Sequence, residues 1–276
     1  MLRFELYKIF RRPRTYISFA LVAAIAFIIQ LAMYVDGLSF VSFATQGISE
    51  QFDLRGSILN GYLVTYLVLQ SLLIHIPLLV ALVAGDALAG EANLGTLRLL
   101  LTKPISRARL VLVKYTASII YAVLLLLWLA VVALAASLLI FGEGDMINLK
   151  SDTVVLLLKD DIMWRYMAAF AFAGVAMMSV AALSLFLSVF ADNSIGPIIG
   201  TMGIIVVLTI LSNLEIPLFN AIKPYLLTTH MIGWKGFFDA PVPYNAIAKS
   251  VGVLLAYSVV FVSATVFIFN RKDIQS

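Results

Sequence analysis

The chain has 276 residues, of which 62% are hydrophobic and 12% are charged. A soluble domain carries about 25% charged and roughly 45–50% apolar residues, so this composition excludes a soluble fold, and it also excludes intrinsic disorder, which requires low hydrophobicity. The chain has no cysteine, which excludes disulfides, thiolate metal sites and a cysteine nucleophile. We therefore expect an all-α polytopic membrane protein with one domain, residues 1–276.

The chain begins with a short basic segment, residues 2–14. Leu2, Leu6 and Ile9 fall on one face of a predicted helix, and basic residues lie on its other sides. Such a helix is expected to lie on the inner leaflet of a membrane, and Pro13 ends it before the first membrane span.

Six long apolar stretches follow. Because a backbone in hydrocarbon must satisfy its own hydrogen bonds, and a helix needs about 20 residues to span it, we interpret these stretches as transmembrane helices. They cover residues 16–35, 62–84, 115–141, 166–190, 195–214 and 250–270.

Two of the connections carry a further expectation. In the loop 142–165, the apolar run 154–158 is expected to dip into the headgroup zone. The segment 212–249 contains four prolines between apolar groups, which makes it too broken for a span and too apolar for a free loop. We expect a re-entrant segment there, because irregular backbone is tolerated at membrane depth when protein or a water-filled cavity surrounds it.

The basic residues predict the orientation. Twelve of the 19 lysines and arginines lie in the N-terminal segment, the connections 86–114 and 191–194, and the C-terminal tail, and this side has a net charge of +7 against −3 on the other. By the positive-inside rule, both termini are cytoplasmic. The basic character of the chain reflects this asymmetry, so no nucleic-acid partner is expected.

The connection between the second and third spans has the most distinctive sequence. Residues 95–101 read as a short interfacial helix, Pro104 interrupts it, and Ser106 is a predicted N-cap of the third span. A stiff helix between two membrane helices can transmit a push from a soluble partner into the membrane.

This connection resembles the signature of ABC-2-type transporter permeases, the membrane subunits of bacterial ABC exporters. The resemblance extends to the basic amphipathic start, the six spans and the cytoplasmic ends. It implies a dimer of permeases, a separate cytoplasmic ABC ATPase that binds ATP and Mg, and a path along the first, second and fifth helices. By the same resemblance, the residues that couple to the ATPase are Glu91, Gly95, Thr96, Leu97, Arg98, Thr102, Lys103, Pro104 and Arg107.

Polar side chains within the second span mark a candidate translocation path. Gln70 and His75 are the candidates, since ionisable residues inside a membrane often belong to a pathway. The alternative is that His75 is a packing residue, hydrogen-bonded to another helix. The spans contain no Asp or Glu, so ion-coupled transport is poorly supported.

Enzyme motifs are missing or misplaced. The pattern at residues 142–145 matches the GxGD of intramembrane aspartyl proteases, but it lies outside the spans and has no second membrane aspartate. The sequence contains neither HExxH nor a phosphate-binding loop. We therefore predict a non-enzymatic permease subunit in the cytoplasmic membrane, in contact with lipids. A secondary transporter, or an anchor that recruits an ATPase for another task, remains an alternative, and the cargo is not indicated.

Overall fold

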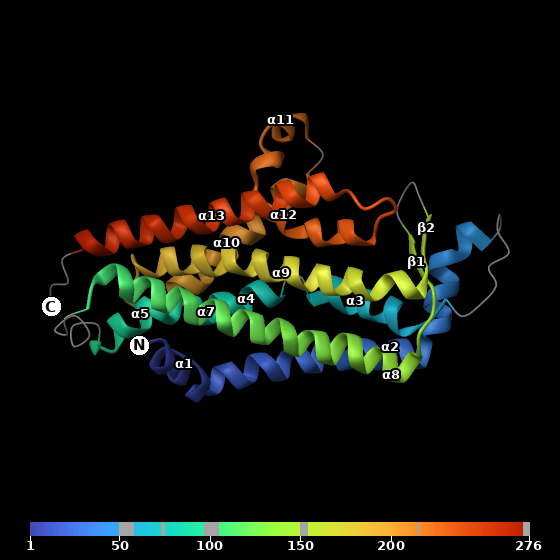
Figure 1. Cartoon of the computed structure of the whole chain (residues 1–276), viewed down its shortest axis with the longest axis horizontal. Helices are drawn as coiled ribbons and strands as arrows, with labels where there is room; N and C mark the ends of the chain where they lie inside the picture. The colour runs from blue at the N-terminus through green and yellow to red at the C-terminus, as the bar shows by residue number, and fades with distance from the viewer. Residues whose placement is uncertain (50–57, 73–74, 97–104, 150–153, 215, 273–276) are drawn as a thin grey trace.

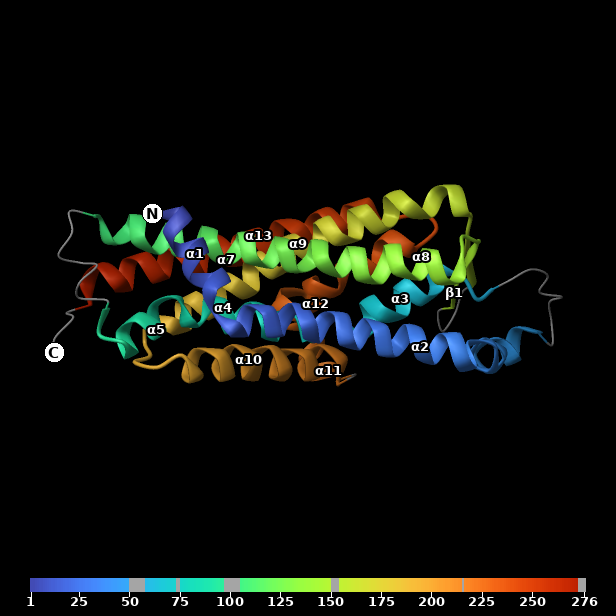
Figure 2. The ribbon, with the colours of Figure 1, turned by 90° about the horizontal axis from the view of Figure 1, so that it is seen from below.

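The computed structural model describes residues 1–49, 58–72, 75–96, 105–149, 154–214 and 216–272. These residues form an elongated bundle of helices (Figures 1 and 2). Five helical segments are long and apolar enough to cross a membrane, and a sixth span results if α3 and α4, which differ in direction by 51°, are counted together. The chain is thus an all-α polytopic membrane protein, as predicted. The main helices are α2 (Pro13–Ser49), α3 (Gly61–Leu72), α4 (His75–Ala84), α7 (Arg107–Ala130), α9 (Lys159–Ser188), α10 (Ile195–Asn213) and α13 (Tyr244–Arg271).

The two ends of the bundle differ in character. One end carries α1 (Leu2–Arg11), α5 (Asp86–Asn93) and the end of α13, and the opposite end carries α8 (Ala136–Phe141) and a β-hairpin (Figure 1). The helix α2 has 37 residues, a length of about 55 Å at 1.5 Å per residue. Because a hydrocarbon core is about 30 Å thick, α2 extends well past the predicted span 16–35.

Most of the apolar run 154–158, which is expected to dip into the headgroup zone, lies in a β-hairpin. Strand β1 (Met146–Leu149) pairs with β2 (Val154–Leu157) in an antiparallel sheet, with Met146 opposite Leu157. Both of these side chains are buried against the bundle, whereas Leu156 is exposed. Paired valines at the start of β2 favour an extended chain, so this apolar run forms a small sheet.

The third predicted span is a continuous helix with a wider turn inside it. The π-helical turn η1 (Val131–Ala135) joins α7 to α8. The buried Gln30 of α2 donates to the carbonyl of Val132 (2.8 Å) and to Ser137 Oγ (3.0 Å), and Thr65 of α3 lies 3.1 Å from the carbonyl of Ala133. Side chains from two neighbouring helices therefore satisfy carbonyls that an α-helix would bond internally.

The proline-rich segment folds into four short helical pieces. They are α11 (Pro217–Asn220), the 3₁₀ turn η2 (Lys223–Tyr225), α12 (Leu227–Met231) and the 3₁₀ helix η3 (Ile232–Phe238). Phe238 is buried and packs edge to face on Tyr66 and Tyr166. Arg165 donates to the carbonyls of Phe237 (2.6 Å) and Asp239 (2.8 Å), so aromatic packing and a buried arginine attach this broken segment to α3 and α9.

The predicted N-terminal helix is present as α1 (Leu2–Arg11). Leu2, Leu6 and Ile9, which share one face of the helix, are half-buried, and α1 packs against α7 and α2. Its exposed aromatic residues are Phe4 and Tyr7. Charged side chains of α1 attach it to the bundle, and its position on the inner leaflet stays a prediction.

Candidate functional site

A group of buried charges joins α1 to the helices on both sides of the predicted coupling connection. Lys114 of α7 is 2% exposed, and its Nζ donates to Glu91 Oε1 (2.6 Å) and to Glu5 Oε2 (3.2 Å). Lys8 Nζ also donates to Glu91 Oε1 (2.6 Å). Glu91 lies in α5 and Glu5 in α1, so this network connects three helices through ionised groups.

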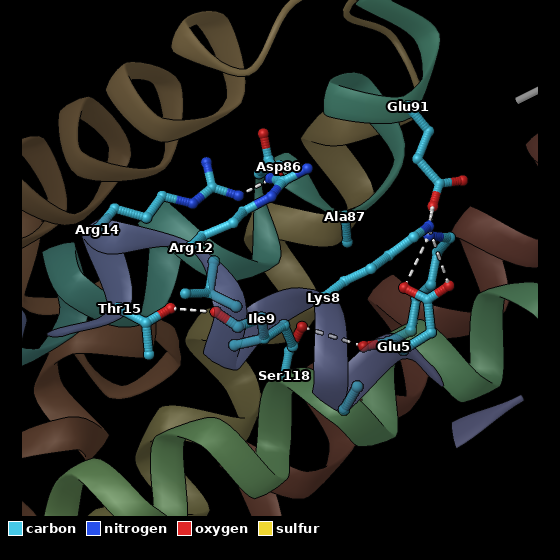
Figure 3. A pocket seen from close by; sticks show the side chains of 13 residues that line it. Glu5, Lys8, Ile9, Arg12, Arg14, Thr15, Asp86, Ala87, Glu91 and Ser118 are labelled. Carbon is cyan, nitrogen blue, oxygen red and sulfur yellow. Dashed lines mark hydrogen bonds and ion pairs between the residues drawn. The ribbon is translucent and has the colours of Figure 1, made fainter. Parts of the chain in front are cut away.

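A second carboxylate anchors the start of α2. Asp86, the first residue of α5, accepts hydrogen bonds from Arg12 and Arg14, which lie at the junction of α1 and α2 (Figure 3). Ser194, in the turn between α9 and α10, donates to the same side chain. Asp86 is 8% exposed, and its three partners bring α1, α2, α5 and the start of α10 to one place.

Together these residues form the charge cluster: Glu5, Lys8, Arg12, Arg14, Asp86, Glu91 and Lys114. Together with apolar side chains, they line a cavity of about 30 Å³, seen from close by in Figure 3. Four cations face three anions, which leaves the cluster with one positive charge in excess. A buried ion is costly unless it is paired and hydrogen-bonded, so the position of each of these helices depends on the others.

The pairing at Glu91 is incomplete. Lys8 and Lys114 both donate to Oε1 of Glu91. Its Oε2 is buried and has no hydrogen-bond partner in the described part of the chain. A buried acceptor without a partner costs free energy. The carboxylate therefore has one free acceptor position two residues before the end of α5.

The coupling residues inferred from the sequence are placed as follows. Glu91 belongs to the charge cluster. Gly95 has a φ of +67°, a conformation that favours glycine, and it follows the end of α5. Thr96 Oγ donates to the carbonyl of Glu91 (3.3 Å). The remaining candidates before Arg107 lie outside the described residues: Leu97, Arg98, Thr102, Lys103 and Pro104.

Arg107 has an attachment that the sequence did not indicate. One guanidinium nitrogen donates to the carbonyls of Phe269 (2.9 Å), Asn270 (3.3 Å) and Lys272 (2.8 Å). These carbonyls end α13, where a basic side chain is favoured. The N-cap prediction for α7 is confirmed, since Ser106 Oγ accepts from the backbone of Arg109 (3.3 Å). The start of α7 is thus attached to the end of α13.

The candidate path residues lie on one polar face. Among the described residues of α3 and α4, three are exposed, and all three are polar: Gln70, Ser71 and His75. His75 Nδ1 lies 3.0 Å from the carbonyl of Ser71, so the histidine bonds within its own span. The helix α4 contacts both α2 and α10 (Figure 2).

Sequence reasoning missed most of the charge cluster. The sequence places five members, Glu5, Lys8, Arg12, Arg14 and Lys114, on the inner side of the membrane but indicates no partner for them. Apart from the neighbouring Glu5 and Lys8, the paired residues lie 23 to 109 residues apart, so local spacing does not indicate the pairs between helices. The sequence did carry one signal. A charged side chain that is buried at the membrane boundary needs a partner of opposite charge, and acidic and basic residues occur together on this side.

Comparison with known proteins adds a family. The profile of a family described as "Protein of unknown function (DUF2705)" matches residues 20–275. No curated protein matches the chain. The match covers all the long helices from early α2 to the end of α13, and the chain therefore belongs to the DUF2705 family.

Proposed function

We propose that this chain is the membrane-spanning permease subunit of an ATP-driven exporter of the ABC-2 type. In this proposal, six spans cross the bacterial cytoplasmic membrane with both termini in the cytoplasm, and α3 and α4 form the second span. A separate cytoplasmic ABC ATPase binds ATP and Mg, and a second copy of the chain, or a close paralogue, completes the transporter. The segment 212–249 is the re-entrant element before the last span.

The charge cluster is the observation that carries the proposal. A connection that transmits force needs its two flanking helices held at defined positions, and Glu91 and Lys114 bond to each other across that connection at 2.6 Å. The N-terminal helix is fixed to both of them through Lys8 and Glu5. A push on residues 95–107 therefore reaches α1, α5 and α7 together.

The polar face of α3 and α4 supports a path beside it. Exposed polar side chains are costly against lipid, yet Gln70, Ser71 and His75 are the exposed described residues of this span. A water-filled path or a second copy removes that cost. We infer that this face lines the path between two copies.

Co-purification tests the partnership. The tagged full chain, extracted from its native membrane in mild detergent, is expected to retain an ABC ATPase that mass spectrometry identifies. Lys114→Met is expected to weaken this association. Arg3→Gln, a change of an exposed residue on the same α1 helix, serves as the matched control. Recovery of the chain without any ABC ATPase contradicts the proposal.

Cysteine accessibility separates a transporter from an anchor. The chain has no cysteine, so Gln70→Cys and His75→Cys each introduce one thiol. In a transporter, a water-soluble thiol reagent reacts with both, and ATP changes the rate. Val259→Cys, at an exposed apolar position of α13, a span outside the proposed path, is the control facing lipid and stays unreactive. Equal protection at all three positions favours an anchor without a path.

A further inference from the structure

An apolar cavity of about 50 Å³ lies inside the bundle, away from the charge cluster. Its walls come from α3, α4, α7 and α9, and its roof is formed by Met231 of α12 and Trp234 of η3. Every one of its lining residues is Leu, Ile, Ala, Phe, Met or Trp. The cavity therefore offers no charged side chain to a ligand.

Small side chains on α9 create this space. Ala169, Ala173 and Ala176 lie at helical spacing on the side of α9 that faces the cavity, opposite Leu72 and Leu129. Protein interiors are close-packed and have few voids larger than a water molecule. Apolar cavities of this kind stay dry and take up apolar molecules.

The cavity lining reaches the surface of α9. Phe170 and Ala173 are the half-buried members of the lining, and their neighbours Met167 and Ala171 are exposed. In the membrane, this surface of an apolar span is covered by lipid chains. In a bilayer, acyl chains are therefore the apolar groups present at high local concentration next to Phe170 and Ala173.

We propose that this cavity binds an acyl chain of a membrane phospholipid. About 10–15 Å³ of such volume holds one water-sized group, so 50 Å³ accepts a short stretch of a chain, with the headgroup left outside. The bound acyl chain contacts Trp234 and Met231 and so packs against the proline-rich segment from inside the cavity. This site does not depend on an ATPase or on the proposed transport function.

Quenching of Trp234 by brominated lipid tests the proposal. Trp234 is 4% exposed, whereas the other two tryptophans, Trp128 and Trp164, are each 38% exposed. Trp128→Phe together with Trp164→Phe leaves Trp234 as the single tryptophan of the full chain, and excitation at the red edge of the tryptophan band avoids the tyrosines. In liposomes of phosphatidylcholine with bromines on the acyl chains, its emission is expected to fall at least twofold relative to unbrominated liposomes.

Filling the cavity distinguishes a bound chain from lipid outside the bundle. In the single-tryptophan background, Ala173→Phe is expected to remove most of the quenching, and Ala171→Phe, on the exposed surface of the same helix, is expected to retain it. Ala176→Leu is a second, milder filling variant if Ala173→Phe does not give a monodisperse protein. Emission that is unaffected by bromine, or quenching that persists in the filled variants, overturns the proposal.

Discussion

The charge cluster makes a quantitative prediction for Lys114→Met. The lysine is 2% exposed and is bonded to two carboxylates, Glu91 and Glu5, that are themselves 4% and 8% exposed. Removing one partner of a buried ion pair costs about 3–5 kcal/mol, because the opposite charge stays buried without compensation. Glu91 keeps Lys8, whose side chain is 31% exposed, so the loss is expected at the lower end of this range, about 3 kcal/mol.

Thermal unfolding in detergent, followed by size-exclusion chromatography of heated samples, measures this loss. For a chain of this size each kcal/mol shifts the midpoint by roughly 2–4 °C, so Lys114→Met is expected to melt about 6–12 °C lower. Adding Glu91→Gln removes the carboxylate charge that has lost its partner Lys114. The double variant is expected to regain part of the lost stability, with a coupling energy between the two substitutions of about 0.5–3 kcal/mol. A midpoint within 1 °C of the unchanged protein, or no recovery in the double variant, refutes the reasoning.

Three further predictions concern other parts of the bundle. Gln30→Leu leaves the carbonyl of Val132 in the π turn η1 without its side-chain donor and is expected to cost about 1–3 kcal/mol, seen as a lower melting midpoint; an unchanged midpoint contradicts a structural role for this bond. Gly61→Ala places a Cβ 2.7 Å from the backbone of α8, whereas the same change at Gly174 meets nothing within 4 Å; only the first is expected to lower the midpoint, and equal effects would count against the close contact. Asp145→Cys is expected to react with a membrane-impermeant reagent in intact cells, and labelling only after lysis contradicts the proposed orientation.

The sequence predicted where the helices lie better than it predicted their ends. Long apolar runs located α9, α10 and α13, because a membrane helix needs an uninterrupted apolar stretch. It missed the extension of α2 past Asp36, since residues beyond the hydrocarbon region are no longer required to be apolar. It also missed β2, because four apolar residues fit a strand, a helix or an interfacial segment equally well.

The candidate site was predictable in its composition and not in its pairings. Glu91 was identified from a motif, and the structure then places its carboxylate on Lys8 and Lys114. The coupling role of Arg107 stays a prediction, and the bonds of its guanidinium to the last carbonyls of α13 were not indicated by the sequence. Such contacts depend on how helices far apart in the sequence pack together, which local spacing does not reveal.

ATP turnover of the co-purified complex in liposomes tests the central claim most directly. The proposal predicts that the ATPase hydrolyses ATP at a different rate with the unchanged chain than alone. It also predicts that Lys114→Met removes this effect, while the matched Arg3→Gln variant keeps it. The proposal of a coupled permease is contradicted if the ATPase hydrolyses ATP at the same rate with the unchanged chain, with either variant and with no permease chain at all.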